Sequence, residues 1–295
     1  MRKDLSVIIV SFNTKELTLT CIDKLRNALA KGKITAEIIV VDNDSHDGSA
    51  ESLKALSNDK DIKVILNKEN TGFGKPNNQG LAIAEGRYVL YLNSDVYVPE
   101  EAFLDDLIKQ MDDNPLLGAL TVRVNLTTGS IDPASHRGFP TVWRSLCYYA
   151  GLEKLTAKIP LLNRIFGGYH LTYLSLSTRH EIDTPTGAFF LARKDVLDVL
   201  KGFDEIFFMY GEDIDLSYRI KRLGYSIIYD PTHTVLHLKN QSGIKRKNNV
   251  TIQKKTRNYF YESMAIFYKK HYEQCYPRWI NALVYAAIDR KKSAV

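Results

Sequence analysis

The first part of the chain alternates short, largely apolar runs with longer segments whose apolar residues recur at helical spacing. The apolar runs are typical of buried strands and lie at residues 5–10, 37–42, 62–66 and 87–92. The intervening segments have the periodicity or the caps of helices and lie at 14–30, 47–56, 75–85 and 99–111, the last with Pro99 in its first turn. This alternation predicts an α/β fold with a mostly parallel central sheet and helices on both faces.

The second part of the chain has a weaker pattern. Between about residues 125 and 183, glycine, proline and aromatic residues occur with little periodicity, which predicts mobile loops and short helices. Further on, the sequence predicts a strand at 184–193, a helix at 213–224 that ends at a glycine, and short strands at 225–229 and 234–238. A chain of 295 residues then fits one large domain with an appendage.

The composition is that of an ordinary globular protein, with 44% hydrophobic and 25% charged residues. No apolar run approaches the roughly 18–20 residues that span a bilayer. The N-terminus enters a strand without the anatomy of a signal peptide. Cys21, Cys147 and Cys275 are scattered, with neither zinc-site spacing nor a disulfide framework. These features predict a cytoplasmic protein.

The positive charge is concentrated in the tail. Residues 239–295 carry a net charge of +10, whereas residues 1–238 carry −4. Within the tail, apolar and aromatic residues at helical spacing over 251–272 precede a mostly apolar stretch at 279–288. That stretch could lie in an anionic membrane interface, anchored by Trp279 and Tyr285.

The alternative for the tail is that its helices pack on the main domain or pair with a second subunit in a homodimer. Both alternatives remain open from the sequence. A nucleic-acid partner is not expected, because the aromatic residues follow helical packing and the main domain is acidic.

Polar segments follow three of the predicted strands, at residues 11–13, 42–49 and 93–95. Any one of them could be an ordinary turn or helix cap. Because the carboxyl ends of parallel strands meet at one edge of a sheet, we expect these segments to lie together. There, Asp42 could accept the N–H of a pyrimidine base, and Asp95 offers a hard oxygen ligand to Mg²⁺ or Mn²⁺, which in turn would hold a diphosphate.

Two further features could join that edge. A glycine-rich loop at residues 70–80 enters a helix and could admit a phosphate or sugar, although it is neither a Walker loop nor a dinucleotide-binding fingerprint. His237 follows a predicted strand, and a histidine there is ordinarily a satisfied polar residue. If its strand lies beside Asp95, the imidazole could complete the coordination of a metal.

Residues 203–215 mix five carboxylates with large apolar and aromatic side chains. A carboxylate among aromatic residues loses hydration, so its pKa rises or it must find a cation, and either outcome suits a general base or a metal site. The alternative is an acidic cap on an amphipathic helix that begins at Glu212.

Together these segments resemble the family-2 inverting glycosyltransferases with the GT-A fold, especially their rhamnosyltransferase-like branch. The resemblance covers about residues 5–243. The segments that carry it are VSFN (10–13), VDNDSHDG (41–48), NTGF (70–73) with NN (77–78), LNSD (92–95), GAFF (187–190), GFDE (202–205) with FMY (208–210), ED (212–213) and His237.

The resemblance implies a nucleoside-diphosphate sugar donor, an Mg²⁺ or Mn²⁺ ion and a single catalytic base. Asp213 matches the base, with Glu212 beside it, and Asp95 and His237 match the metal ligands. Asn93 departs from the family, since a neutral amide replaces a carboxylate at the first position of the metal motif, which predicts weaker metal binding. The donor would contact Ser11, Phe12, Asn13, Asp42, Asn43, Asn70, Gly72, Phe73, Asn78, Asn93, Ser94 and Asp95.

The same resemblance implies a division of the chain. Residues 1–243 would form the GT-A catalytic domain, with a nucleotide-binding half at about 1–98 and an acceptor and catalytic half at about 99–243. Residues 244–295 would form a basic, aromatic helical extension. The expected reaction transfers a sugar, first of all from dTDP-rhamnose, to a hydroxyl of a glycan or lipid-linked acceptor in cell-surface polysaccharide assembly. The enzyme would act in the cytoplasm or at the inner face of the plasma membrane.

Three other functions remain, of which a structural partner protein would not bind the donor at all. A sugar-1-phosphate nucleotidyltransferase also needs a nucleotide-binding sheet and metal-binding aspartates, but residues 11–14 do not form its glycine- and arginine-rich loop. A non-catalytic nucleotide-sugar-binding protein would bind the donor without transferring it.

Overall fold

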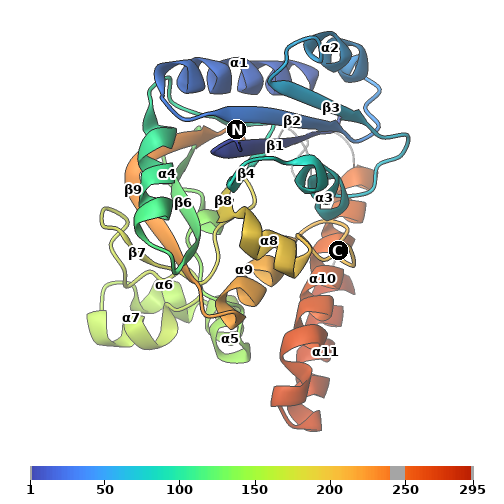
Figure 1. The fold of residues 1–295 in the computed structure, drawn as a ribbon. Helices are drawn as coiled ribbons and strands as arrows, with labels where there is room; N and C mark the ends of the chain where they lie inside the picture. Colours follow the sequence, from blue (N-terminus) through green and yellow to red (C-terminus); the bar gives the residue numbers. More distant parts are fainter. Residues whose placement is uncertain (1, 240–249, 294–295) are drawn as a thin grey trace.

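The computed structural model describes residues 2–239 and 250–293, with side chains over 2–239 and 254–293. The predicted boundary at residues 243 and 244 lies outside the described residues. One sheet runs through the molecule in the order β3-β2-β1-β4-β8-β6-β9-β5, with β7 paired to β9 (Figure 1).

The half of the chain that is predicted to bind the nucleotide contains the parallel part of the sheet. Its strands are β1 (Leu5–Ser11), β2 (Ala36–Asp42), β3 (Ile62–Leu66) and β4 (Tyr88–Asn93), and all their pairings with one another are parallel. The connecting helices are α1 (Lys15–Lys31), α2 (Ser49–Leu56) and α3 (Gly74–Ile83). These elements agree with the predicted ones to within about two residues at most ends, because fully buried strands have continuous apolar runs.

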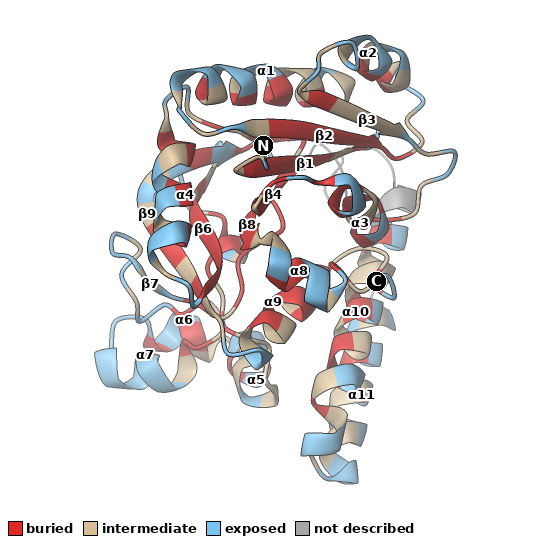
Figure 2. Cartoon of the chain, in the orientation of Figure 1, coloured by how far each residue is buried: buried red, intermediate tan, exposed pale blue. Residues whose placement is uncertain are grey.

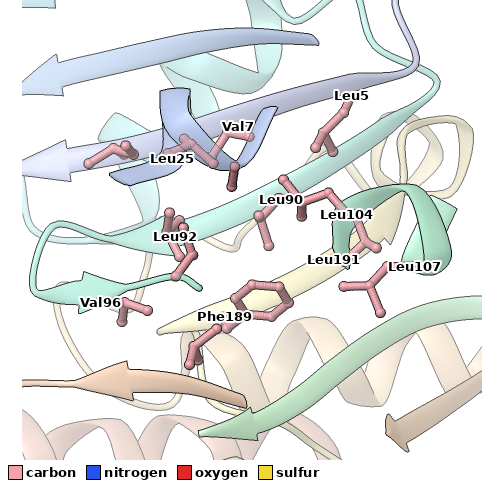
Figure 3. Close-up of a cluster of buried hydrophobic side chains, with 14 of the residues drawn as sticks. Leu5, Val7, Leu25, Leu90, Leu92, Val96, Leu104, Leu107, Phe189 and Leu191 are labelled. Atoms are coloured by element: carbon pink, nitrogen blue, oxygen red, sulfur yellow. The ribbon is translucent and has the colours of Figure 1, made fainter. Parts of the chain in front are cut away.

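The two faces of the sheet pack on different helices. On one face, Leu5, Val7 and Ile9 lie in a core with residues of α1 and of α4 (Phe103–Asp113), as Figure 3 shows around Leu25 and Leu104. On the other face, Ile8 packs with α3, α8 (Lys194–Leu200) and α9 (Glu212–Arg222). This separation follows from the alternation of side chains along a strand.

The second half of the sheet is mixed. β8 (Phe189–Arg193) runs antiparallel between β4 and β6 (Leu117–Leu126), and β6 pairs parallel with β9 (Ser226–His237). The short strands β5 (Val96–Tyr97) and β7 (His180–Glu181) pair antiparallel with β9.

Several predicted boundaries were wrong in this half. Helix α4 begins at Phe103, beyond Pro99, and only the end of the predicted strand at 184–193 is β8. The two strands predicted at 225–229 and 234–238 are one strand, β9, whose register with β6 shifts after Asp230. Proline follows Asp230 and cannot donate to a ladder, so the apolar pattern breaks although the strand continues.

The weakly patterned region contains short helices, as predicted. They are η1 (Pro133–Ser135), α5 (Val142–Tyr149), α6 (Leu152–Thr156) and α7 (Pro160–Phe166). Helices α5, α6 and α7 contact one another. Figure 1 shows them at the end of the molecule away from α1 and α2.

The C-terminal extension is a helical hairpin of α10 (Val250–His271) and α11 (Arg278–Ser293), joined through η2 (Glu273–Cys275). Its residues Phe267, Tyr268 and Tyr272 pack with Phe207, which precedes α9. No helix within residues 2–239 and 250–293 is long and apolar enough to cross a membrane.

Candidate active site

The polar segments that follow the strands do meet at one edge of the sheet. Ser11 lies opposite Asp42 in the register of β1 with β2, and Val10 lies opposite Asn93 in that of β1 with β4. Directly beyond, the backbone N–H of Asn43 donates to the carbonyl of Ser11. The convergence expected from parallel strands is therefore confirmed.

Asp42 has an unused acceptor at this edge. Its side chain is buried, and its Oδ2 atom accepts a hydrogen bond from the backbone N–H of Ser45 at 3.0 Å. Its Oδ1 atom has no hydrogen-bond partner among the described residues. Because a buried acceptor without a partner is costly, the arrangement suits an N–H group supplied by a ligand.

The first segment divides into inward and outward residues. The hydroxyl of Ser11 is buried and lies 2.9 Å from that of Thr18, so this side chain stabilises the packing of α1 rather than facing a ligand. Phe12 is exposed at the edge. Asn13 has a φ of 53° and accepts the backbone N–H of His46, which joins the first segment to the second.

Asn43 ties the second segment to the glycine-rich loop. Its amide donates to the side chain of Asn70 at 3.0 Å and to the carbonyl of Gly72 at 2.8 Å. Gly72 has a φ of 88°, and a Cβ atom there would lie 2.1 Å from the carbonyl oxygen of Phe208. The same carbonyl accepts the N–H of Phe73. Glycine is therefore required where this loop meets the segment that precedes α9.

Asn78 has a structural position in this geometry. Its amide donates to the carbonyl of Phe203 and to the side chain of Glu205, and its Oδ1 atom accepts the N–H of Phe203. The side chain thus connects α3 to the loop before α9, so its predicted contact with the donor has no support in this arrangement.

The predicted metal ligands lie together. Val96 pairs with His237 in the register of β5 with β9, and the Nε2 atom of His237 lies 3.2 Å from Oδ1 of Asp95. The other ring nitrogen lies 3.0 Å from Oδ2 of Asp132, which is fully buried and also paired with Lys239. Burial alone would lower the pKa of His237, but the hydrogen bonds to the carboxylates outweigh it and raise this pKa to about 9.

The remaining residues of the metal motif are held by neighbours. The backbone N–H of Asn93 donates to the carbonyl of Ala188, and the hydroxyl of Ser94 lies 3.1 Å from that of Thr14. Ser94 is buried. These contacts fix the backbone that presents Asp95.

The donor set at Asp95 and His237 fits Mg²⁺ or Mn²⁺ with two protein ligands. Among residues 2–239 and 254–293, no group of three or more histidine, cysteine, aspartate or glutamate side chains is arranged around a metal position. Further ligands would therefore come from diphosphate oxygens and water, which is common for Mg²⁺. Asp132 supports the fit, since a carboxylate on the second ring nitrogen orients a metal-binding histidine.

Asp213 is held at the first turn of α9. Its Oδ2 atom accepts from the guanidinium of Arg137 at 2.8 Å and from the N–H of Gly187 at 3.3 Å. Its Oδ1 atom accepts the N–H of Ile214 and keeps a second lone pair. Gly211, with a φ of 81°, allows the sharp turn into the helix.

Glu212 differs from its neighbour. It is buried, and its Oε2 atom has no hydrogen-bond partner among the described residues. Burial, followed by the charge of Asp213, raises the pKa of Glu212 to about 8. The two adjacent carboxyl groups therefore have different surroundings, since Asp213 is paired with Arg137 whereas Glu212 has a buried oxygen without a partner among the described residues.

One short backbone segment links the predicted catalytic base to the predicted metal site. The N–H of Gly187 binds Asp213, and the carbonyl of the next residue, Ala188, binds Asn93 at the start of the metal motif. The predicted base and the predicted metal ligands consequently lie at the same end of the sheet, although Asp95 comes from the first half of the chain and Asp213 and His237 come from the second.

Two residues of the site were not predicted from the sequence. Asp132 caps the N-terminus of η1 and Arg137 lies shortly after this helix, both in the region of weak periodicity. Each contacts a residue more than 70 positions away, so no local pattern reports the contact. The only sequence signal was indirect, since a buried carboxylate cluster requires cations from elsewhere.

Solved structures with this architecture are glycosyltransferases. Staphylococcus aureus TarS 1–349 in complex with UDP-GlcNAc matches with a TM-score of 0.55 and 22% identity, over 89% of this chain and 65% of that one. GalNAc-T7 with UDP, GalNAc and Mn²⁺ matches with a TM-score of 0.60 and 14% identity, over 89% of this chain and 47% of that one. The fold is therefore the GT-A fold.

The sequence comparisons give the family. Residues 6–200 match the model of glycosyl transferase family 2, and the chain belongs to this family. It is 26% identical over 216 residues to the N-acetylglucosaminyl-diphospho-decaprenol L-rhamnosyltransferase of Mycobacterium tuberculosis, over 70% of this chain and 67% of the relative.

A second relative matches over a shorter length. The chain is 33% identical over 102 residues to the poly(ribitol-phosphate) beta-glucosyltransferase of Bacillus spizizenii, which is 34% of this chain and 16% of the relative. The resemblance to family 2 and to its rhamnosyltransferase-like branch is thus confirmed, and the chain is a glycosyltransferase.

Proposed function

We propose that the protein is an inverting, divalent-cation-dependent transferase that moves a sugar from a nucleoside diphosphate to a hydroxyl of a glycan or lipid-linked acceptor in cell-surface polysaccharide assembly. The observation that carries this proposal is the backbone link from Asp213 through Gly187 and Ala188 to the segment of Asp95 and His237. This link supports the proposal, because it brings the predicted base and the predicted metal ligands to the same end of the sheet.

In this reaction Asp213 accepts the proton of the acceptor hydroxyl while the hydroxyl oxygen attacks the anomeric carbon. The bond from that carbon to the diphosphate breaks, and the nucleoside diphosphate leaves with the bonding electrons. An alcohol becomes acidic only late in such a displacement, so a carboxylate held by Arg137 and Gly187 can serve when it is well positioned. A bound Mg²⁺ or Mn²⁺ would neutralise charge on the departing diphosphate, with Asp95 and His237 holding it.

The donor follows from the family branch. The name of the mycobacterial relative gives a rhamnosyl group and a decaprenol-linked acceptor. We therefore propose dTDP-rhamnose as the first donor to test, with UDP-hexoses next. The unpartnered Oδ1 atom of Asp42 supports a nucleoside whose base presents an N–H group.

The test is transfer from a panel of nucleotide sugars to a soluble glycan acceptor, with Mg²⁺, with Mn²⁺ and with EDTA. We expect one donor to give product, an anomeric configuration opposite to that of the donor by NMR, and at least about tenfold loss of activity with EDTA. Retention of configuration would contradict the single displacement, and activity unchanged by EDTA would contradict the cation.

Calorimetry and analysis of the products separate two of the other functions. A non-catalytic binding protein would show donor binding by calorimetry without release of nucleoside diphosphate. A nucleotidyltransferase would form pyrophosphate from a nucleoside triphosphate and a sugar 1-phosphate.

A further inference from the structure

Helices α5, α6 and α7 present an unusual surface, which we call the 142–166 face. Of the twenty large apolar side chains exposed in the described residues, nine lie between residues 143 and 165. Leu155 and Leu161 are the most exposed of these, at 76% and 72%. Figure 2 shows α7 largely exposed at the end of the molecule away from α2. A concentration of this kind marks an interaction site rather than scattered surface residues.

Helices α6 and α7 are inverted relative to ordinary surface helices, since their buried side chains are polar. Glu153 is buried and binds the backbone N–H and the ring of His170. Asn163 is buried and accepts from the hydroxyl of Thr172. With the polar residues satisfied inside, the leucines and isoleucines are left outside, which suits an apolar partner.

The charges around the face have one sign. Lys154, Lys158 and Arg164 are exposed, and none of them is in an ion pair with another described residue. The only carboxylate of residues 142–166 is that of Glu153, which is buried. Apolar side chains surrounded by unpaired cations are the pattern of helices that lie in an anionic membrane interface.

The end of the C-terminal hairpin adds to this charge. The Nζ atom of Lys291 lies 5.1 Å from the centre of the Tyr149 ring, which places the last turn of α11, with Arg290 and Lys292, beside α5. Tyr285, by contrast, packs in the interior of the hairpin and donates to Glu273. At this end the tail thus contributes Arg290 and Lys291, whereas Lys292 is paired with Glu262 and the exposed Trp279 and Leu283 lie nearer the start of α11.

We propose that the 142–166 face binds the surface of an anionic lipid bilayer without crossing it. The charge argues against a second copy of the chain as the occupant, because a self-contact of this face would bring like charges together. The face is also close to the chemistry, since Arg137, which binds Asp213, precedes α5 by only five residues. The idea that the face delivers a lipid-linked acceptor rests on the proposed function, whereas lipid binding itself does not.

The test is flotation of the full chain with vesicles of phosphatidylcholine alone or mixed with phosphatidylglycerol. We expect binding to the mixed vesicles, weakened by salt, and little binding to the neutral ones. The double variants Leu155→Ser with Leu161→Ser, and Lys154→Glu with Lys158→Glu, should each lose at least about tenfold in vesicle binding. The matched control, Leu116→Ser with Val199→Ser, removes equally exposed apolar side chains elsewhere and should bind like the wild type.

Gel filtration and sugar transfer distinguish lipid binding from dimerisation and from the proposed reaction. Equal vesicle binding by all variants, or none by the wild type, would overturn the proposal, as would a leucine variant that converts a dimer into a monomer in gel filtration. Transfer to a soluble acceptor is measured on the same preparations. Lost vesicle binding with normal transfer supports the proposal, and absent transfer with normal vesicle binding contradicts only the proposed reaction.

Discussion

Arg137 determines how the Asp213 carboxylate is presented. It is largely buried, donates to Asp213 and to the carbonyl of Pro185, and its backbone pairs with Thr184. The bond to Oδ2 leaves Oδ1 toward the reacting hydroxyl in the proposed mechanism. Arg137 is therefore a positioning residue, because it acts on the substrate only through Asp213.

Replacement of Arg137 should affect turnover more than donor binding. For Arg137→Gln we expect kcat to fall about tenfold or more while KM for the donor changes little, because the carboxylate loses its fixed orientation. Arg137→Lys should recover part of the loss, since a cation remains. Steady-state kinetics with thermal unfolding as a folding control would measure both. A rise in KM alone would place Arg137 in donor binding instead.

The raised pKa of Glu212 should make the stability of the folded protein depend on pH. Its pKa rises from an ordinary 4.5 to about 8 on folding, so the folded state binds more protons between these values and stability falls as the pH rises through them. Glu212→Gln should remove that fall. We expect the variant to be more stable than the wild type by about 1–3 kcal/mol near pH 8 and no more stable near pH 4.

Urea unfolding across this pH range would measure the difference for Glu212→Gln. Glu51→Gln, on the exposed side of α2, serves as the control and should track the wild type throughout. A gain for Glu212→Gln that is independent of pH would contradict the protonation argument.

At the scale of elements, α10 is bound to α9 by a buried ionic cluster. Asp215 is fully buried and accepts from Arg219, Lys270 and His271 at 2.7 Å each. Burial alone would raise the pKa of Asp215, but the hydrogen bond from His271 and the charge of Arg219 lower it to about 2. Ser263 of α10 also donates to the carbonyl of Met209, just before the turn into α9. The hairpin thus contacts both α9 and the segment that leads into it.

Removing the Asp215 charge should loosen this docking. Asp215→Asn should destabilise the protein by about 3 kcal/mol at pH 7, because Arg219 and Lys270 lose their buried carboxylate partner and His271 loses a hydrogen-bond acceptor. The lowered pKa of Asp215 stabilises the folded protein fully only above the ordinary pKa of 3.8. The difference in stability between the wild type and Asp215→Asn should therefore shrink as the pH falls from about 4 to about 2.

Asp204→Asn is the matched control for Asp215→Asn. Asp204 pairs with the same Lys270 but is partly exposed, so its loss should cost less than about 1 kcal/mol. Chemical denaturation would separate the two variants, and equal effects would contradict a buried role for Asp215.

The elements also show what the sequence could and could not predict. The parallel strands β1 to β4 and the polar residues at their ends were predictable, because fully buried strands are apolar throughout and their ends share one edge. β6 was missed, and β9 was divided at Asp230 by the proline that follows it. Asp132 and Arg137 were missed because their partners are brought close only by the folded sheet.

At the scale of the whole molecule, the residues of the proposed site come from two parts of one sheet. The parallel half supplies Asp42 and Asp95, and the mixed half supplies Arg137, Asp213 and His237. The connection between them is the β4–β8 pairing, which extends to the Ala188–Asn93 hydrogen bond. The 142–166 face contributes none of these residues, whereas the C-terminal hairpin packs against α9 and the segment before it.

The most direct measurement is the turnover of Asp213→Asn, with donor affinity determined by calorimetry on the same preparation. Asp198→Asn is the control, because Asp198 lies on α8 and pairs with Lys194 away from the site. We expect kcat of Asp213→Asn to fall by at least about 100-fold while its donor Kd stays within about threefold of the wild type, and we expect the control to be unaffected. Near-normal turnover of Asp213→Asn would contradict the central claim that this carboxylate is the catalytic base.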